Sequence, residues 1–280
     1  MSLKMLTAVR DMCRIVQTFR RSDDDFAFRA RRIRKVCRTY QATLADHNRR
    51  FLYRNVSCEQ PVLSNNRECS FIIDPARKVG YCFISKVAST TAKTIFGHLL
   101  NISHMGNTLE SIHRAFHEKV HTVSPMTFLQ RSSQESYTTA MFVNHPFERL
   151  VFAYVDKVIR QRGGSVYFYG RYFNDVPGVR ETGRNLTFPE FIDYILDQSV
   201  NQMNSHWTPY YVTCQPRAVN DGCSVRLKDI PPKNTGGDHG FRKAARDFFN
   251  ELTFHQVMRL YDRFFFDFEM FGYDFRDYLH

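Results

Sequence analysis

The sequence has no long apolar run, and this absence limits how the chain can meet a membrane. No uninterrupted apolar stretch among its 280 residues reaches about 18, whereas a membrane-spanning helix needs roughly 20 such residues. Residues 1–21 also lack the apolar core of a secretory signal peptide. We therefore predict no transmembrane helix and no signal segment in this chain.

Several motifs of metal and nucleic-acid binding are absent as well. The seven cysteines include no Cys-x-x-Cys pair and no Cys/His spacing typical of zinc sites. No RNA-recognition, zinc-finger or helix-turn-helix signature occurs. His113, His117 and His121 recur every four residues, as zinc ligands on a helix can, but a solvated helix face is the favoured interpretation. We predict no metal and no nucleic-acid partner.

Positive charge is what the sequence has in excess. The formal net charge is +11, which favours polyanionic partners such as acidic polysaccharides and nucleotides. Part of this charge lies between Arg29 and Arg38, where a solvated helix face is favoured over a binding patch. Hydrophobic residues make up 43% of the chain and aromatic residues 15%, so a sizeable core is expected and global disorder is excluded.

The cysteines and glycosylation sequons bear on the compartment. Cys58 with Cys69, and Cys214 with Cys223, flank short loops. Each pair can form a disulfide in an oxidising lumen, and free buried cysteines are the equal alternative. Three Asn-x-Ser/Thr sequons point weakly to such a lumen. They lie at Asn55, Asn101 and Asn185.

Two strand–helix units are predicted from the apolar pattern. The run Val79–Ile84 has strand length, and apolar residues then recur at helical spacing to Leu100, with Ser89 or Thr90 as a possible N-cap. Thr138–Val143 is a second strand, and Pro146 opens a helix with a continuous apolar stripe. Strands alternating with helices indicate an α/β fold with a parallel sheet.

The remaining segments are predicted from caps and turn residues. Residues 26–45 form a basic amphipathic helix, whereas 54–78 and 215–240 are loop-like. Capping boxes start helices at Thr187 and at Thr253, and Gly272 can close the second of these. We divide the chain into a basic N-terminal helical segment, 1–50, and one domain, 51–280.

The segment Ile84–Lys93 is the strongest candidate for chemistry. It joins a strand to a helix, so backbone N–H groups and the positive end of the helix dipole meet there. Hydroxyl groups and two lysines add donors and charge, which suits a phosphate. The Walker A pattern is absent, and an ordinary polar turn is the alternative.

This segment also carries a family resemblance. Lys86-Val-Ala-x-Thr-x-x-Lys93, after the strand residues Tyr81-Cys-Phe83, is similar to the loop that holds the 5′-phosphosulfate in the chondroitin/dermatan 4-O-sulfotransferases. Phe142-Val-x-x-Pro-Phe-Glu-Arg-Leu-Val-x-Ala-Tyr154 resembles that family's site for the donor's 3′-phosphate. Further matches follow in family order, so that the resemblance covers roughly residues 29–279. They are Phe188-x-Glu-Phe-Ile192, Asn204-x-His-Trp207, Cys214-x-Pro216 and Leu260-Tyr-x-x-Phe264.

The resemblance implies a fold and an activity. The fold is a P-loop-like sulfotransferase fold, with a central parallel sheet flanked by helices. The activity is sulfuryl transfer, without a metal, from 3′-phosphoadenosine-5′-phosphosulfate to a hydroxyl of N-acetylgalactosamine in chondroitin or dermatan. The family works in the Golgi, so a glycosaminoglycan acceptor and a Golgi location are the expected partner and place.

The resemblance and the residue chemistry together assign the expected site residues. Lys86 is expected to stabilise the leaving phosphate, and His206 or His145 to take the sugar proton, because imidazole titrates near working pH. Each histidine has a structural alternative, packing beside Trp207 for one and helix capping for the other. The donor-binding residues are predicted to be Lys86, Val87, Ala88, Ser89, Thr90, Thr91, Lys93, Asn144 and Arg149.

Two positions depart from the family pattern. Asn144 stands where the family has Arg, and Phe152 where it has Ser, and in the family both groups grip the 3′-phosphate. Since a charged hydrogen bond is worth about 1.5–3 kcal/mol and a neutral one about 1, donor affinity should fall by at least one or two decades. Arg149, Lys157 or Arg160 can compensate. The alternative function is therefore a weak or inactive relative that binds glycosaminoglycan.

Overall fold

The computed structural model describes most of the chain from residue 23 onward. The described residues are 23–44, 70–102, 106, 108–120, 122–135, 137–160, 170, 172–173, 176–177, 179–200, 202–214, 226–227 and 241–279. The predictions for residues 1–21, Asn55, Cys58, Cys69, His121 and Cys223 lie outside them, as do most of the predicted loops. The division at residue 50 stays a prediction.

A small mixed sheet forms the centre of the N-terminal half. Its strands are β1 (Phe71–Asp74), β2 (Val79–Cys82), β3 (Thr138–Met141) and β4 (Arg226–Leu227), hydrogen-bonded in that order. The β2–β3 and β3–β4 pairs are parallel, with Tyr81 opposite Ala140, whereas β1 pairs with β2 antiparallel. The predicted parallel arrangement therefore holds for the pairs β2–β3 and β3–β4.

The antiparallel strand β1 corrects the prediction that residues 54–78 are loop-like. Asp74 ends this strand and accepts hydrogen bonds from the backbone N–H groups of Ala76 and Arg77. Lys78 then takes a left-handed conformation with φ of 52°, so a tight turn returns the chain into β2. Four residues are a weak signal in a sequence, and pairing with β2 is what makes the segment a strand.

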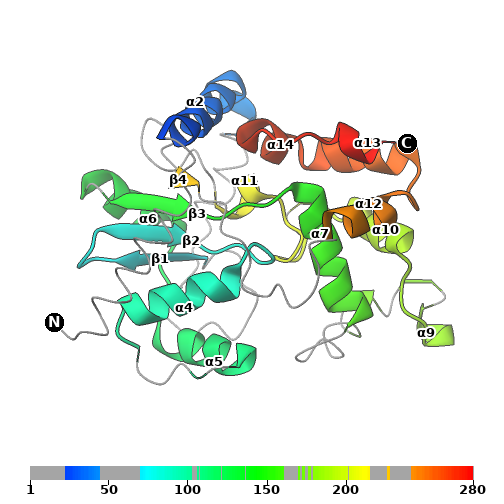
Figure 1. Cartoon of the computed structure of the whole chain (residues 1–280), viewed down its shortest axis with the longest axis horizontal. Coiled ribbons are helices and arrows are strands. Elements are labelled where there is room, and N and C mark those ends of the chain that lie inside the picture. Colours follow the sequence, from blue (N-terminus) through cyan, green and yellow to red (C-terminus); the bar gives the residue numbers. More distant parts are fainter. Residues whose placement is uncertain are drawn as a thin grey trace.

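Helices lie on both faces of this sheet (Figure 1). On one face, α4 (Ser89–Leu99) and α5 (Leu109–Lys119) pack on Ile72 and Tyr81. On the other, α2 (Asp23–Thr39) and α14 (Phe265–Phe271) pack on Phe71 and Cys82. Side chains alternate across a strand, so neighbouring residues of β1 and β2 serve opposite layers.

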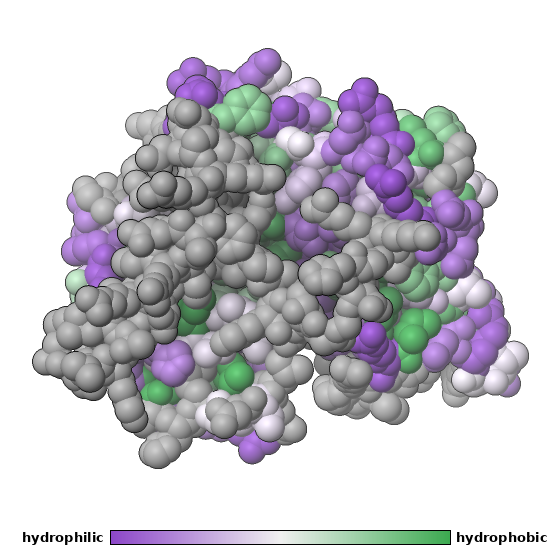
Figure 2. All heavy atoms as spheres, in the orientation of Figure 1, coloured by the Kyte–Doolittle hydropathy of each residue, from purple (hydrophilic) through white to green (hydrophobic). Residues whose placement is uncertain are grey.

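The N-terminal helix has the predicted amphipathic pattern. Ile33, Val36 and Cys37 are buried, whereas Arg31 and Lys35 are exposed. In the space-filling view, hydrophilic atoms gather over α2 at the upper rim of the molecule (Figure 2). The interpretation of a solvated basic face agrees with this arrangement.

A second core lies beside the sheet, around α7 (Pro146–Tyr154), which continues as a π-helical turn η2 (Val155–Ile159). Phe147 and Leu150 of α7 are fully buried against the C-terminal helices. The other helices of this half are α10 (Phe188–Asp197), α11 (Tyr210–Thr213), α12 (Phe241–Phe249) and α13 (Phe254–Arg263). Short elements complete it: α9 (Val179–Thr182) and the 3-10 turn η4 (Arg276–Tyr278), while α6 (Pro125–Gln134) precedes β3.

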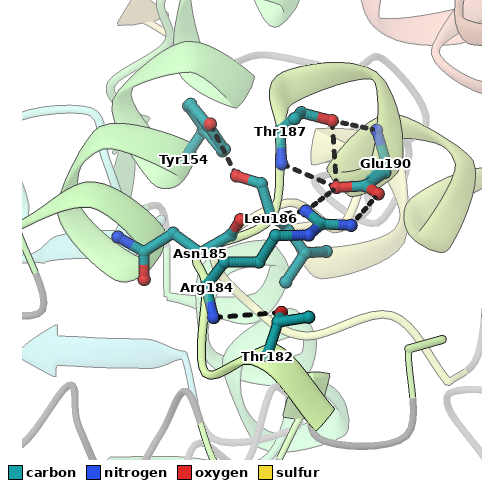
Figure 3. A network of polar contacts seen from close by, with 7 residues as sticks. All are labelled: Tyr154, Thr182, Arg184, Asn185, Leu186, Thr187 and Glu190. Atoms are coloured by element: carbon teal, nitrogen blue, oxygen red, sulfur yellow. Dashed lines mark hydrogen bonds and ion pairs between the residues drawn. The ribbon is translucent and has the colours of Figure 1, made fainter. Parts of the chain in front are cut away.

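Local signals placed the helix ends of this half correctly. Thr187 and Glu190 form the predicted capping box at α10, and Arg184 adds two hydrogen bonds to the same carboxylate (Figure 3). Thr253 and Gln256 form the other box, at α13. The predicted last helix divides at Phe264 into α13 and α14, and Gly272 closes α14 with φ of 71°.

The disulfides differ from the predicted pairs. Cys214 bonds to Cys82, with 5.8 Å between their Cα atoms, and not to Cys223. Cys37 is also disulfide-bonded, so the alternative of free cysteines is wrong for all three. The Cys82–Cys214 bond joins residues 132 positions apart, which short-loop spacing cannot indicate. It ties the end of β2 to the segment that follows α11.

No helix in the described part of the chain is both long enough and apolar enough to cross a bilayer.

Candidate functional site

The loop between β2 and α4 has an unusual backbone. Lys86 and Ala88 both take left-handed conformations, with φ of 68° and 58°. Such conformations cost a residue other than glycine about 1 kcal/mol or more, and they persist where the surroundings demand them. Two of them within three residues mark this loop as a candidate for binding or catalysis.

The same conformation opens the N-terminus of α4. Ala88 is the N-cap residue and has no side chain that can accept a hydrogen bond, so neither Ser89 nor Thr90 caps the helix as predicted. The first N–H groups of α4 therefore lack a side-chain cap. Ser89, Thr90 and Thr91 are half-buried within this first turn. Free helix N-termini with adjacent hydroxyls suit an anion.

Lys86 reaches from this loop to the end of α7. Its Nζ lies 2.5 Å from Oδ2 of Asp156, and the same oxygen lies 3.2 Å from Nζ of Lys157. Burial lowers the pKa of Lys86, although Asp156 opposes that effect. Burial alone would raise the pKa of Asp156, but the two lysines outweigh it and hold that pKa below 3.8. The carboxylate thus stays ionised between two ammonium groups.

Arg149 joins the two strand–helix units at a second point. Its side chain is 1% exposed, and its three nitrogens donate to the backbone carbonyls of Ser85, Thr208 and Ser205 at 2.7–2.9 Å. The guanidinium also lies 4.8 Å from the ring centre of Tyr210. These bonds differ from the predicted donor-binding role, because they engage the guanidinium in holding three segments together.

His206 lies in the segment that Arg149 holds. Its Nδ1 is 2.6 Å from Oδ1 of Asn204, which also accepts the backbone N–H of His206. An amide oxygen only accepts, so Nδ1 carries the proton and Nε2 is the basic nitrogen. Burial is the main reason that the pKa of His206 lies well below 6.5. The positive charges of Lys86, Lys157, Arg149 and Lys93 lower this pKa further. The imidazole is therefore neutral in the free protein.

His145 caps a helix, which was the structural alternative to its role as a base. Its Nδ1 accepts the backbone N–H of Phe147, which makes it the N-cap of α7, and its Nε2 lies 3.0 Å from the carbonyl oxygen of Asp274. Aromatic rings surround it, with Tyr278 and Tyr273 at centroid distances of 4.9 and 5.3 Å. Because both nitrogens already serve the fold, the prediction of His145 as a base loses its geometric basis.

Asn144 is held by its backbone. The hydroxyl of Tyr210 donates to the Asn144 carbonyl at 2.9 Å and accepts its N–H at 3.1 Å. Burial raises the pKa of Tyr210 well above its usual range, so this hydroxyl stays protonated. Phe152 of α7, eight residues further along the chain, is half-buried. Neither side chain supplies the positive charge that the family pattern has at these positions.

Lys93 and His113 meet on the other side of the loop. Nζ of Lys93 lies 2.9 Å from Nδ1 of His113, whose Nε2 is 3.2 Å from the hydroxyl of Thr90. Burial lowers the pKa of Lys93 to about 8. His113 is half-buried against α4, so the expectation of a solvated face is wrong at this position. No cluster of three or more metal-ligating side chains occurs within the residues that the structure describes.

Comparison with known proteins adds a family to this geometry. Residues 70–231, more than half of the chain, match the model of the "Sulfotransferase family". The chain belongs to the sulfotransferase family. The chain is 32% identical to carbohydrate sulfotransferase 14 of Mus musculus over 146 residues, which cover 50% of the chain and 38% of that relative. The chain thus spans well under half of that relative's length.

Two further relatives extend the similarity along the chain. Carbohydrate sulfotransferase 11 of Rattus norvegicus is 25% identical over 262 residues, covering 80% of this chain and 72% of the relative. Carbohydrate sulfotransferase 8 of Homo sapiens is 26% identical over 255 residues, covering 79% and 59%. No solved structure matches. The resemblance to carbohydrate sulfotransferases is confirmed, and its 4-O branch stays a prediction.

The sequence does not identify all residues that shape this candidate site. Asp156 and Asn204 were not singled out for a role, although each lies within or just after a motif shared with the family. Lys157 was considered only as compensation near Asn144, whereas it lies at the Lys86 end of the site. Proximity of an acidic residue to the loop depends on how α7 docks, which no local pattern shows.

Proposed function

We propose that this protein transfers a sulfuryl group from 3′-phosphoadenosine-5′-phosphosulfate to a hydroxyl of a carbohydrate, with a chondroitin-type N-acetylgalactosamine as the acceptor. The observation that carries the proposal is the grouping of three lysines at the start of α4, which has no side-chain cap: Lys86 and Lys157 share one oxygen of Asp156, and Lys93 lies on α4 itself. Like charges gathered in a half-buried site repel one another, so such a group favours an anionic ligand.

The convergence of the two units supports a single site. Arg149 of α7 bonds to the carbonyl of Ser85 at 2.9 Å, and Asp156 contacts Lys86. In Figure 1 the loop after β2 runs toward α7, and so does the segment before α11. The arrangement of strand, anion-binding loop and helix on parallel neighbours agrees with the P-loop-like sulfotransferase fold, which we propose for residues 51–280.

The proposed step is an in-line sulfuryl transfer. The bond from sulfur to the bridging phosphate oxygen breaks while sulfur bonds to the sugar oxygen, and the products are the sulfated sugar and 3′-phosphoadenosine 5′-phosphate. Lys86, with the N–H groups and hydroxyls of Ser89 to Thr91, stabilises the charge that builds on the leaving phosphate. Loss of one such donor commonly costs about 100- to 1000-fold in rate.

His206 is the proposed base that takes the sugar proton. Its Nδ1–H bond to Asn204 leaves Nε2 as the proton acceptor, and its low pKa keeps the free imidazole neutral. When the donor's negative charges enter, they offset the four cations, so the pKa of His206 rises toward the range in which a base is effective. The imidazole thus gains basicity only after the donor is in place.

A weak or inactive relative that binds glycosaminoglycan is the second candidate. The observation that favours it is the loss of charge at the expected 3′-phosphate site, where Asn144 and Phe152 stand and Arg149 is engaged by three carbonyls. Under this candidate the basic surface of the chain would bind the polysaccharide without transfer. A Golgi location is proposed under both candidates from the family resemblance.

A transfer assay separates the two candidates. We expect the purified chain to move label from the sulfate donor to desulfated chondroitin, and Lys86→Ala to lower the rate about 100- to 1000-fold. Arg259→Ala, which removes an exposed positive charge on α13, is the matched control and should keep the rate. Absence of transfer, together with absence of calorimetric binding of 3′-phosphoadenosine 5′-phosphate, would leave only the polysaccharide-binding candidate.

A further inference from the structure

An acidic side chain occupies the centre of the proposed anion site. Asp156 lies in the π-helical turn η2, directly after α7, and its Oδ2 contacts Nζ of both Lys86 and Lys157. The Lys86 and Lys157 side chains are only 19% and 15% exposed. π-Helical turns inside helices frequently occur at functional sites. This turn places Asp156 and Lys157 together against the loop of Lys86.

A carboxylate here opposes the ligand that the site is built to bind. Two negative groups that share one ammonium partner repel each other by an energy comparable to the attraction of either for the cation. A donor whose sulfonate or phosphate oxygens approach Lys86 therefore competes with Asp156. The carboxylate is also able to leave, since it is 33% exposed and its ion pairs are with two flexible lysines.

We propose that Lys86 and Lys157 form a two-lysine subsite for a sulfonate or phosphate group, and that Asp156 is the resident counter-ion which this group replaces. The inference rests on the proposed function, because it concerns how the same site accepts the donor. Lys157 then supplies from η2 a second positive charge at the Lys86 end of the site. Asp156 returns to the lysines when the nucleotide product leaves.

The counter-ion explains how the lysines stay ordered before the donor arrives. Two neighbouring, half-buried ammonium groups without an anion would repel each other, and burial already lowers the pKa of Lys86. Asp156 offsets this repulsion and opposes the fall in the pKa of Lys86. The consequence is a lower affinity for nucleotide, and a faster release of product, than the two lysines would give alone.

Calorimetric titration with 3′-phosphoadenosine 5′-phosphate tests the proposal on the full chain. Asp156→Asn keeps the shape of the side chain and removes its charge, so we expect binding about three- to tenfold tighter. Lys157→Gln should weaken binding about 10- to 100-fold, as expected for loss of a charged hydrogen bond. Asp262→Asn, an equal charge change on the exposed face of α13, is the matched control and should leave affinity unchanged.

The outcomes distinguish this inference from the proposed function. If the unaltered chain binds no nucleotide and transfers no sulfuryl group, the proposed function fails. If it binds nucleotide but Asp156→Asn binds equally or more weakly, the counter-ion is refuted while the proposed function stands. Should Asp156→Asn melt early and resist measurement, Lys157→Gln decides, because unchanged affinity in that variant overturns the two-lysine subsite. Inorganic sulfate in a parallel titration shows whether the subsite takes the oxyanion without the nucleoside.

Discussion

The two strand–helix units of the sheet have the same plan and opposite characters. In the first, β2 leads through a loop with two left-handed residues into α4, whose N-cap Ala88 offers no side-chain acceptor. In the second, β3 leads into α7, which has His145 as its cap and Pro146 in its first turn. The loop of the first unit is strained and half-exposed, whereas the helix start of the second unit is capped and buried.

This contrast shows how one plan serves two purposes. A helix start without a side-chain cap, two lysines and backbone strain make the first unit suited to an anion. The start of the second unit has instead become part of the core, where Arg149 and Tyr210 hold neighbouring segments by backbone carbonyls. Its contribution to the site comes from the far end, through Asp156 and Lys157.

The largest expected effect comes from removing the buried link between the units. Arg149→Met keeps much of the volume but leaves three carbonyls without their donors, so we expect the free energy of unfolding to fall by about 3–5 kcal/mol. Denaturant unfolding measures this. Arg259→Met on the surface of α13 should change it by under about 1 kcal/mol. Equal effects of the two variants would show that the buried bonds of Arg149 stabilise the fold no more than a surface charge does.

The next prediction compares His206, the proposed base, with His145, the cap of α7. His206→Ala should lower sulfuryl transfer about 100-fold or more, because a general base commonly contributes that much. His145→Ala should lower the free energy of unfolding by about 1–2 kcal/mol, through loss of its cap, and keep transfer by the folded molecules. Rate and stability are measured on both variants. A loss of transfer in His145→Ala without a loss of stability would restore that histidine as a catalytic candidate.

The pH dependence of nucleotide binding probes the first unit. Lys93 has a pKa of about 8 in the free protein, below its ordinary 10.5, because it is buried. Its positive charge is therefore lost as the pH rises through 8, and nucleotide affinity should fall by up to about tenfold between pH 7 and 9.5. Calorimetry checks this. Lys93→Arg, which stays charged, should remove the decline, and an unchanged decline would assign it to another group.

The smallest expected effect concerns backbone strain. Ala88→Gly should be neutral or stabilise the fold by up to about 1 kcal/mol, because glycine adopts positive φ without a steric penalty. Gly272→Ala, at the left-handed end of α14, should destabilise it by about 1 kcal/mol. Thermal unfolding compares them. A clear loss of stability in Ala88→Gly would show that the loop is not strained at that residue.

Local chemistry made part of this structure predictable. The capping boxes at Thr187 and Thr253 and the glycine stop at Gly272 act within a few residues, so sequence spacing reports them directly. The same holds for the two parallel strands β2 and β3. Strand β1 was missed because four residues become a strand only by pairing, and the split of the last helix at Phe264 was missed because the apolar stripe continues through it.

The sequence predicted several residues of the candidate site, but it did not predict which residues they contact. The sequence identified Lys86, its hydroxyl-rich loop and His206, because these residues follow a strand or stand in a family motif. It did not identify Asp156 as the contact of Lys86, the Asn204 bond that orients His206, or Cys82 as the partner of Cys214. Each of these pairs except Asn204–His206 joins segments far apart along the chain.

The sequence alone determined the helix caps, the charge, the anion-suited loop and the family. Those properties depend on residues within one or two helical turns of each other, or on residue types that can be recognised without knowing their contacts. Only the tertiary structure decided that Arg149 and His145 serve the fold, and that Lys157 and Asp156 join the site. Burial and hydrogen bonding between distant segments set the role of a charged side chain, and docking of α7 against the first loop brings those segments together.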